Sequence, residues 1–211
     1  MESPRHVPQA DPFVFAHKGW FYLYGTNDAA PDDGLPVWRS RDALHWEKPQ
    51  LALRRGDAYG RRGFWAGCVL ARGGKFYLLY TANEQLAVAV SDSPAGPFVG
   101  VGGSREPMAS IGKEIDADWF VDKDGTVYIV FVRLGGGNRI FIARMNDDDL
   151  AAVFRFRTQT EPTAPDAGIL GYRNLESLDV FLLGPLGEPH LVAETGPIGL
   201  FDLQTVQRQG I

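Results

Sequence analysis

The sequence predicts an all-β protein of the β-propeller type, and a repeated hairpin is the main reason. Three segments consist of a short apolar strand, a tight turn with a glycine, and a strand rich in aromatic and β-branched residues: 13–25, 68–80 and 119–131. Their turn glycines, Gly19, Gly74 and Gly125, lie 55 (74 − 19) and 51 (125 − 74) residues apart. Hairpins that recur at this period are typical of propeller blades.

Composition supports the same class. The 25 glycines and 14 prolines fall between apolar runs, as the turns of a strand-rich protein require, and no long amphipathic helix is apparent. Hydrophobic residues make up 45% and charged residues 22% of the 211 residues, which is ordinary for one globular domain spanning 1–211. Aromatic residues reach 12%, which suits blade cores and also sugar-binding clefts.

Further strands are expected after each hairpin, at the outer edge of each blade. In the first blade these strands are expected at 36–40 and 44–47, and in the second at 86–91 and 92–98. In the third blade they are expected at 139–144 and 146–150. From Ala151 the character changes, and 151–211 forms a divergent tail. There, 179–193 reads as a degenerate fourth hairpin around Gly187, weakened by Pro189, which removes a ladder hydrogen bond. The prediction is an incomplete propeller whose exposed blade edges favour self-association.

Charge, cysteine content and the lack of long apolar segments limit the classes of binding partner and the cellular location that we expect. The net charge of −5 argues against a nucleic-acid partner. Cys68 is the one cysteine, so no intramolecular disulfide can form. The N-terminal residues contain no apolar stretch typical of a signal peptide, and no segment is apolar enough to span a membrane. We therefore expect a cytoplasmic location and no membrane partner.

Acidic residues stand directly ahead of the first and third hairpins. Asp11 lies in 9–13, Asp116 lies in 113–118, and Trp65 precedes the second hairpin. Because the innermost strand of each blade starts beside the central channel, the two carboxylates are expected to face each other with Trp65 along the rim. Paired carboxylates across a cavity suit glycosidic bond hydrolysis. The alternatives are an Asp-Pro turn at Asp11 and a strand-start residue at Asp116, with Asp118 equally eligible.

At these residues the sequence resembles glycoside hydrolase family 43, roughly over residues 9–150. The resemblance rests on Ala10-Asp-Pro12 before a Tyr-rich hairpin, Phe64-Trp-Ala66 before Gly-Lys-Phe-Tyr-Leu-Leu-Tyr80, and three later motifs: Ala89-Val-Ser-Asp-Ser-Pro-Ala-Gly-Pro-Phe98, Ile115-Asp-Ala-Asp-Trp-Phe-Val-Asp-Lys-Asp-Gly125 and the stretch 131–146. It implies a five-bladed propeller that hydrolyses α-L-arabinofuranosides or β-D-xylosides with inversion, and hence a carbohydrate substrate.

The resemblance also implies roles for individual residues. Asp11 matches the general base that activates water, and Asp116 matches the aspartate that tunes the pKa of the general acid and helps to orient it. Trp65 matches a position lining the pocket. Its neighbour Phe64 and Arg133, just after the third hairpin, are further expected substrate contacts.

Two departures from the family concern the chemistry. After Trp65-Ala66 the family has Pro and then an acidic residue, whereas this chain has Gly67 and Cys68, which we interpret as a small buried thiol rather than a nucleophile. The family's general acid, a Glu in a Glu-Gly-Pro setting, is not identified. Glu194, in Glu-Thr-Gly-Pro, is the remaining candidate. His190 does not match the family's metal-binding histidine, so we expect no bound metal and no cofactor.

These departures leave three functional hypotheses. The first is a glycosidase whose activity is impaired by the unrecognised general acid. The second is a non-catalytic relic or carbohydrate-binding fragment of the same fold, consistent with a truncated or frame-shifted reading after residue 150. The third, a propeller that serves as a protein-interaction scaffold, does not explain acidic residues ahead of the first and third hairpins.

Overall fold

The computed structural model describes Val7 and residues 9–108, 112–134, 138–145, 180–183 and 189–193. It divides the chain into two compact units, Met1–Tyr172 and Arg173–Ile211. The change of character predicted at residue 151 falls outside the described residues and stays a prediction. The described residues include no helix that is long and apolar enough to cross a membrane.

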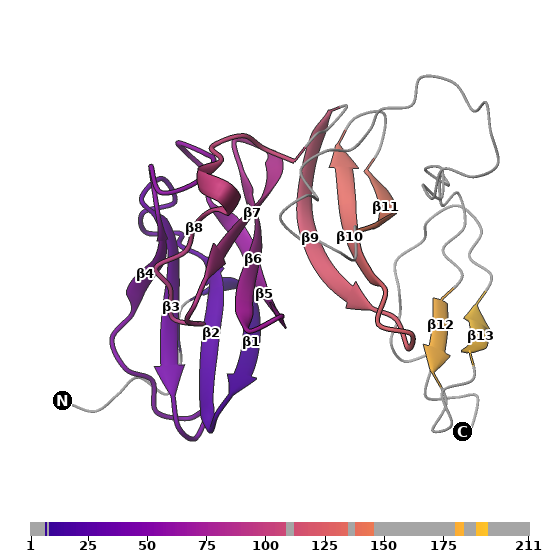
Figure 1. The fold of residues 1–211 in the computed structure, drawn as a ribbon, viewed down its shortest axis with the longest axis horizontal. Coiled ribbons are helices and arrows are strands. Elements are labelled where there is room, and N and C mark those ends of the chain that lie inside the picture. The colour runs from indigo at the N-terminus through magenta and orange to yellow at the C-terminus, as the bar shows by residue number, and fades with distance from the viewer. Residues whose placement is uncertain are drawn as a thin grey trace. The chain divides into compact units, whose positions relative to one another are not determined.

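The first unit contains three antiparallel sheets (Figure 1). The first is ordered β1 (Ala10–His17), β2 (Trp20–Thr26), β3 (Gly34–Ser40), β4 (Gln50–Arg54). The second is ordered β5 (Trp65–Arg72), β6 (Lys75–Ala82), β7 (Gln85–Ser91), β8 (Val99–Gly100), followed by the 3₁₀ turn η1 (Val101–Gly103). The third is ordered β11 (Arg139–Arg144), β10 (Val127–Leu134), β9 (Lys113–Val121). The second unit contains the hairpin β12 (Val180–Leu183) and β13 (Pro189–Ala193).

The three predicted hairpins are confirmed as β1–β2, β5–β6 and β9–β10. The hairpin predicted around Gly187 is present as β12–β13, with Pro189 at the first position of its strand. A proline is tolerated there because the missing N–H interrupts the ladder only at its end.

Two predicted outer strands are wrong. Segment 44–47 contributes only a single bridge between Trp46 and Ser40, because the Asp42 carboxylate accepts hydrogen bonds from the backbone N–H of Leu44 and His45 and holds a turn. The fourth strand is β4 instead. Segment 92–98 is a loop stabilised by serine hydroxyls that accept backbone N–H groups, and the strand follows it as β8. Residues 146–150 lie outside the described residues.

Both faces of the second sheet are buried. Side chains along a strand alternate between the two faces, so neighbouring residues of one strand pack against different sheets. On β6, Leu78 and Tyr80 belong to the cluster packed against the first sheet, while Leu79 belongs to the cluster packed against the third. All three are 0% exposed. The Tyr24 hydroxyl donates to the carbonyl of Pro94 and links β2 to the loop before β8. This stacking fixes the starts of β1, β5 and β9 relative to one another.

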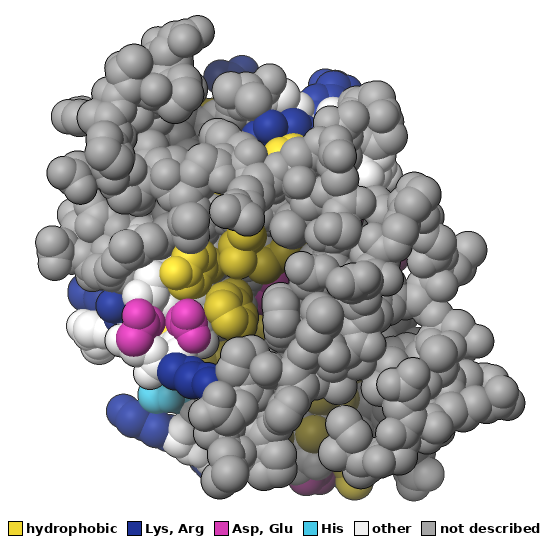
Figure 2. Space-filling model, turned by 90° about the vertical axis from the view of Figure 1, so that its right-hand side faces the viewer, with side chains coloured by type: hydrophobic (Ala, Val, Ile, Leu, Met, Phe, Trp, Pro, Cys, Tyr) yellow, Lys and Arg dark blue, Asp and Glu magenta, His cyan; other side chains and the backbone are white. Residues whose placement is uncertain are grey.

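Some large apolar side chains on the first strands remain exposed. Val14 of β1 and Phe120 and Val121 of β9 are 51%, 42% and 47% exposed. Figure 2 shows a face of the molecule on which hydrophobic side chains lie beside acidic and basic ones. The self-association expected from exposed sheet edges stays a prediction.

Candidate active site

The same backbone irregularity occurs near the start of the first strand in each sheet. Pairing shifts register between Ala10 and Phe13 in β1, between Trp65 and Cys68 in β5, and opposite 130–132 in β9. The residue inside each bulge has positive φ: Asp11 (50°), Ala66 (44°) and Asp116 (54°). Positive φ is uncommon for residues other than glycine, although Asp tolerates it better than most. Two of the three bulges carry a carboxylate.

Asp11 is held by the second strand of its own sheet. The Thr26 hydroxyl donates a 2.6 Å hydrogen bond to Oδ2 of Asp11. The Gln9 side chain donates to the carbonyl of Thr26, which draws the start of β1 close to β2. Gly25 permits this approach, because a Cβ there would lie 2.4 Å from the carbonyl oxygen of Ala10.

Asp116 is held through its backbone N–H, and its carboxyl group is affected by the charge of Asp11. Its N–H donates to the Thr81 hydroxyl at 3.2 Å. Partial burial raises the pKa of the Asp116 carboxyl above its ordinary value, and the negative charge of Asp11 raises it further. The two carboxyl groups therefore lie within electrostatic reach of each other, although they come from the first and third sheets.

Trp65 and Phe64, adjacent in sequence, lie in different environments. The N–H of Gly63 donates to Asp32 Oδ1 at 2.8 Å, which anchors the approach to β5. Trp65 is partly exposed and packs over Gly63, where a Cβ would lie 2.9 Å from the indole ring. Phe64 is 1% exposed and stacks on Tyr80 with ring centroids 6.1 Å apart. This burial argues against the expected substrate contact at Phe64, whose ring belongs to the core.

Arg133 lies on β10 and pairs with a buried carboxylate. Its Nη2 and Nε lie 2.6 and 3.0 Å from Oε1 of Glu114, a carboxylate only 3% exposed. Its guanidinium carbon lies 4.3 Å from the centre of the Phe141 ring. These contacts neutralise a buried acid, which is a structural task. Contact between Arg133 and a substrate stays a prediction.

Cys68 is a buried thiol, as the sequence predicts. It is 4% exposed, and its Sγ lies 3.3 Å from the carbonyl oxygen of Ala117 in β9. Burial raises the pKa of the Cys68 thiol well above its ordinary value, and the charge of Asp118 adds to the effect. A thiol held neutral in this way is a poor nucleophile.

The candidate general acid Glu194 lies outside the described residues, and His190 is described only by its place in β13. Among the residues that the structure describes, no three His, Cys, Asp or Glu side chains are grouped to hold a metal ion. The absence of a bound metal stays a prediction, and we derive no step through one.

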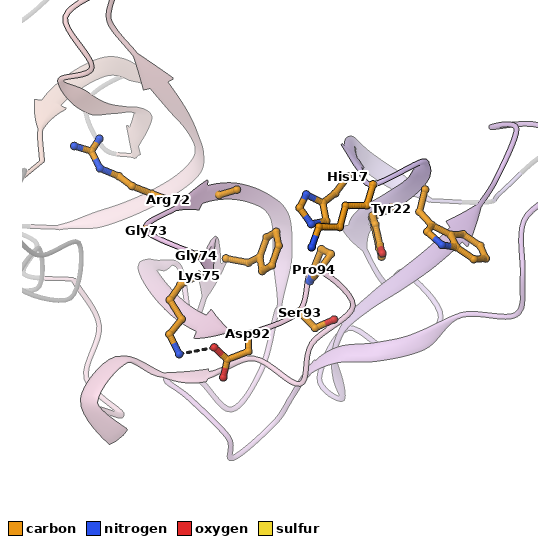
Figure 3. Close-up of a pocket in the computed structure, with 13 residues that line it drawn as sticks. His17, Tyr22, Arg72, Gly73, Gly74, Lys75, Asp92, Ser93 and Pro94 are labelled. Carbon is orange, nitrogen blue, oxygen red and sulfur yellow. Dashed lines mark hydrogen bonds and ion pairs between the residues drawn. The ribbon is translucent and has the colours of Figure 1, made fainter.

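A groove of about 670 Å³ lies elsewhere, at the turn ends of the first two sheets. His17 and Tyr22 come from the first hairpin and Arg72 and Lys75 from the second, and Lys75 pairs with Asp92 (Figure 3). These turns stand at the opposite ends of β1 and β5 from the bulges. The groove contains neither bulge carboxylate, so it is separate from the candidate active site.

Comparison with known proteins identifies the family. The family model described as glycosyl hydrolases family 43 matches residues 6–170. The chain belongs to this family. The match extends beyond residues 9–150, over which the sequence resemblance is expected, and the all-β propeller fold is confirmed, with three blades among the described residues of the first unit.

Relatives of this family 43 chain include xylan- and arabinan-related enzymes. A xylosidase/arabinosidase of Bacteroides ovatus is 30% identical over 148 residues, covering 61% of this chain and 44% of the relative. A solved endo-1,4-beta-xylanase of Bacteroides thetaiotaomicron is 38% identical with a TM-score of 0.65, covering 72% of this chain and 51% of that one. An endo-arabinase from the same species is 26% identical with a TM-score of 0.59, covering 70% and 54%. The chain spans about half the length of these relatives.

Sequence reasoning missed two residues of the candidate site, Thr26 and Thr81. A signal was present, because each lies seven residues after the turn glycine of its hairpin (26 − 19 and 81 − 74). That spacing places both at the end of a second strand, opposite the residue that precedes the bulge of the first.

Proposed function

We propose that this chain carries part of a glycosidase active site for arabinose- or xylose-containing glycosides, with Asp11 as general base. One observation carries the proposal: two carboxylates stand on matching bulges of the first and third blades, close enough for Asp11 to raise the pKa of Asp116. Family membership and the names of the relatives give the substrate class.

The proposed reaction is hydrolysis with inversion at the anomeric carbon. Asp11 accepts a proton from a water molecule while the oxygen of that water bonds to the anomeric carbon. The glycosidic C–O bond breaks, and the leaving oxygen takes a proton from the general acid. Asp116, whose pKa is raised by burial and by the Asp11 charge, would tune and orient that acid. The acid itself remains to be assigned, with Glu194 as candidate.

The test compares hydrolysis of aryl α-L-arabinofuranoside and aryl β-D-xyloside by wild type, Asp11→Asn and Asp92→Asn. Aryl leaving groups need little help from an acid, so they report on the base. We expect Asp11→Asn to lose about 10²–10⁴-fold in kcat, the usual contribution of a general base. Asp92→Asn is the matched control, because its side chain is 83% exposed in the remote groove.

Equal background rates in all three proteins would overturn the catalytic proposal. In that event, calorimetry with xylo- and arabino-oligosaccharides separates the remaining alternatives. Binding without turnover would indicate a non-catalytic carbohydrate-binding fragment of the same fold.

A further inference from the structure

We propose that Thr26 is a positioning residue for the general base: its hydroxyl orients the Asp11 carboxylate and ties it to the bulge of the second blade. The inference rests on the proposed function of Asp11. It adds a residue from outside the paired carboxylates and gives a reason why the base is held in one orientation.

The Thr26 hydroxyl is engaged on both sides. It donates to Oδ2 of Asp11 at 2.6 Å and accepts the N–H of Ala66 at 3.1 Å. Ala66 is the positive-φ residue of the second bulge. One hydroxyl therefore connects the carboxylate on the first bulge to the backbone of the next. A donor to an ionised oxygen at this distance makes a strong, directional hydrogen bond.

The same arrangement recurs at the next junction. Thr81, which is 0% exposed, accepts the N–H of Asp116 at 3.2 Å. In both cases a threonine at the end of a second strand holds the bulge of the following blade. The matching position of the third sheet is Val132, which pairs with Ile115 as Thr81 pairs with Trp65. Valine has no hydroxyl, so the device belongs to the first two junctions.

Burial makes Thr26 a positioning residue rather than a substrate contact. Thr26 is only 6% exposed. Its loss is therefore expected to lower kcat with little change in KM. Hydrogen bonds to charged groups correspond to about 10- to 100-fold in an equilibrium or rate, and we expect a loss of kcat within that range.

The test uses Thr26→Val, which preserves shape and removes the hydroxyl, and Thr26→Ser, which restores it. Thr126→Val is the matched control, since Thr126 is also buried, at 8% exposed, but stands in the turn of the third hairpin. For Thr26→Val we expect the drop in kcat with little change in KM. Thr26→Ser should recover most of the lost kcat, and Thr126→Val should show no such loss.

A second readout works whether or not the chain turns over substrate. NMR of the same proteins follows amide exchange at Ala66 and the carboxyl carbon signal of Asp11. We expect faster exchange and a shifted carboxyl signal in Thr26→Val, both restored in Thr26→Ser. Unchanged signals in Thr26→Val would overturn the positioning role. An inactive wild type with the expected NMR changes would instead count against the proposed function and leave the contact established.

Discussion

Asp116 combines an unusual backbone conformation with an unfavourable electrostatic environment. It has positive φ at a bulge, and it lies within reach of a second carboxylate from another sheet. Burial and the Asp11 charge both disfavour its ionised form, so its pKa is raised. The fold therefore maintains an arrangement that costs stability, as is common where a site serves chemistry.

Asp116→Asn should stabilise the chain at neutral pH. The folded protein holds the pKa of Asp116 above that of the unfolded chain, so its ionised form destabilises the fold and its protonated form does not. The gain should appear as pH rises through the raised pKa and vanish at pH values below the unfolded chain's titration. Solvent screening keeps it under about 1 kcal/mol. Urea unfolding at acidic and neutral pH measures it, and a gain that is equal or larger at acidic pH would contradict the assignment.

The two acids could be selected from the sequence, but their environment could not. Asp11 and Asp116 stand ahead of hairpins whose period is visible in the chain. Their positive φ depends on bulges in strand pairing, and their hydrogen bonds to Thr26 and Thr81 depend on contacts within and between blades, which the regular spacing of the threonines does not reveal by itself. The environment of Phe64 is a further example, because its ring is buried against Tyr80 while its neighbour Trp65 remains partly exposed. Contact between Phe64 and a substrate stays a prediction that this burial disfavours.

At the scale of elements, hairpins were predictable and outer strands less so. A hairpin is specified by its turn glycine and the strands beside it, all local features. The outer strands are short, and backbone N–H groups that donate to the side chains of Asp42, Ser91 and Ser93 hold two expected strands as turns. The first blade also depends on a close contact at Gly34, where β3 begins against β4.

Gly34→Ala should weaken the first blade more than Gly73→Ala weakens the second. Both glycines have positive φ, at 133° and 58°. A Cβ at Gly34 would lie 2.0 Å from the carbonyl oxygen of Leu53, whereas a Cβ at Gly73 meets nothing within 4 Å. We expect a loss of about 1 kcal/mol for Gly73→Ala, from backbone strain alone, and more than about 2 kcal/mol for Gly34→Ala. Denaturant midpoints measure both, and equal losses would contradict the packing argument.

Across the first unit, stability depends on the junctions between sheets. The central part of the second sheet is covered on both faces. One hydrophobic cluster joins it to the first sheet, and a second cluster joins it to the third. Cys68 lies in the second cluster, with its sulfur against the backbone of β9. Its accessibility therefore reports on whether the second and third sheets stay packed together.

Cys68 should label slowly with a thiol reagent while the protein is folded. Burial raises the pKa of the thiol and removes it from solvent, so reaction requires the junction to open. We expect labelling to be at least about a hundredfold slower in buffer than in concentrated urea at the same pH. The absorbance of the thiolate released by the reagent measures both rates. Comparable rates in the two conditions would show that the second and third sheets separate readily.

The bulge at Ala66 has a consequence for engineering. Three blades present one residue in the same backbone conformation, and only the first and third use it for an acid. The backbone of each bulge therefore fixes the position of one side chain, and the identity of that side chain decides which functional group is placed there. In the second blade this position carries the methyl group of Ala66, beside the partly exposed Trp65. A new functional group could be introduced there without redesigning a single strand.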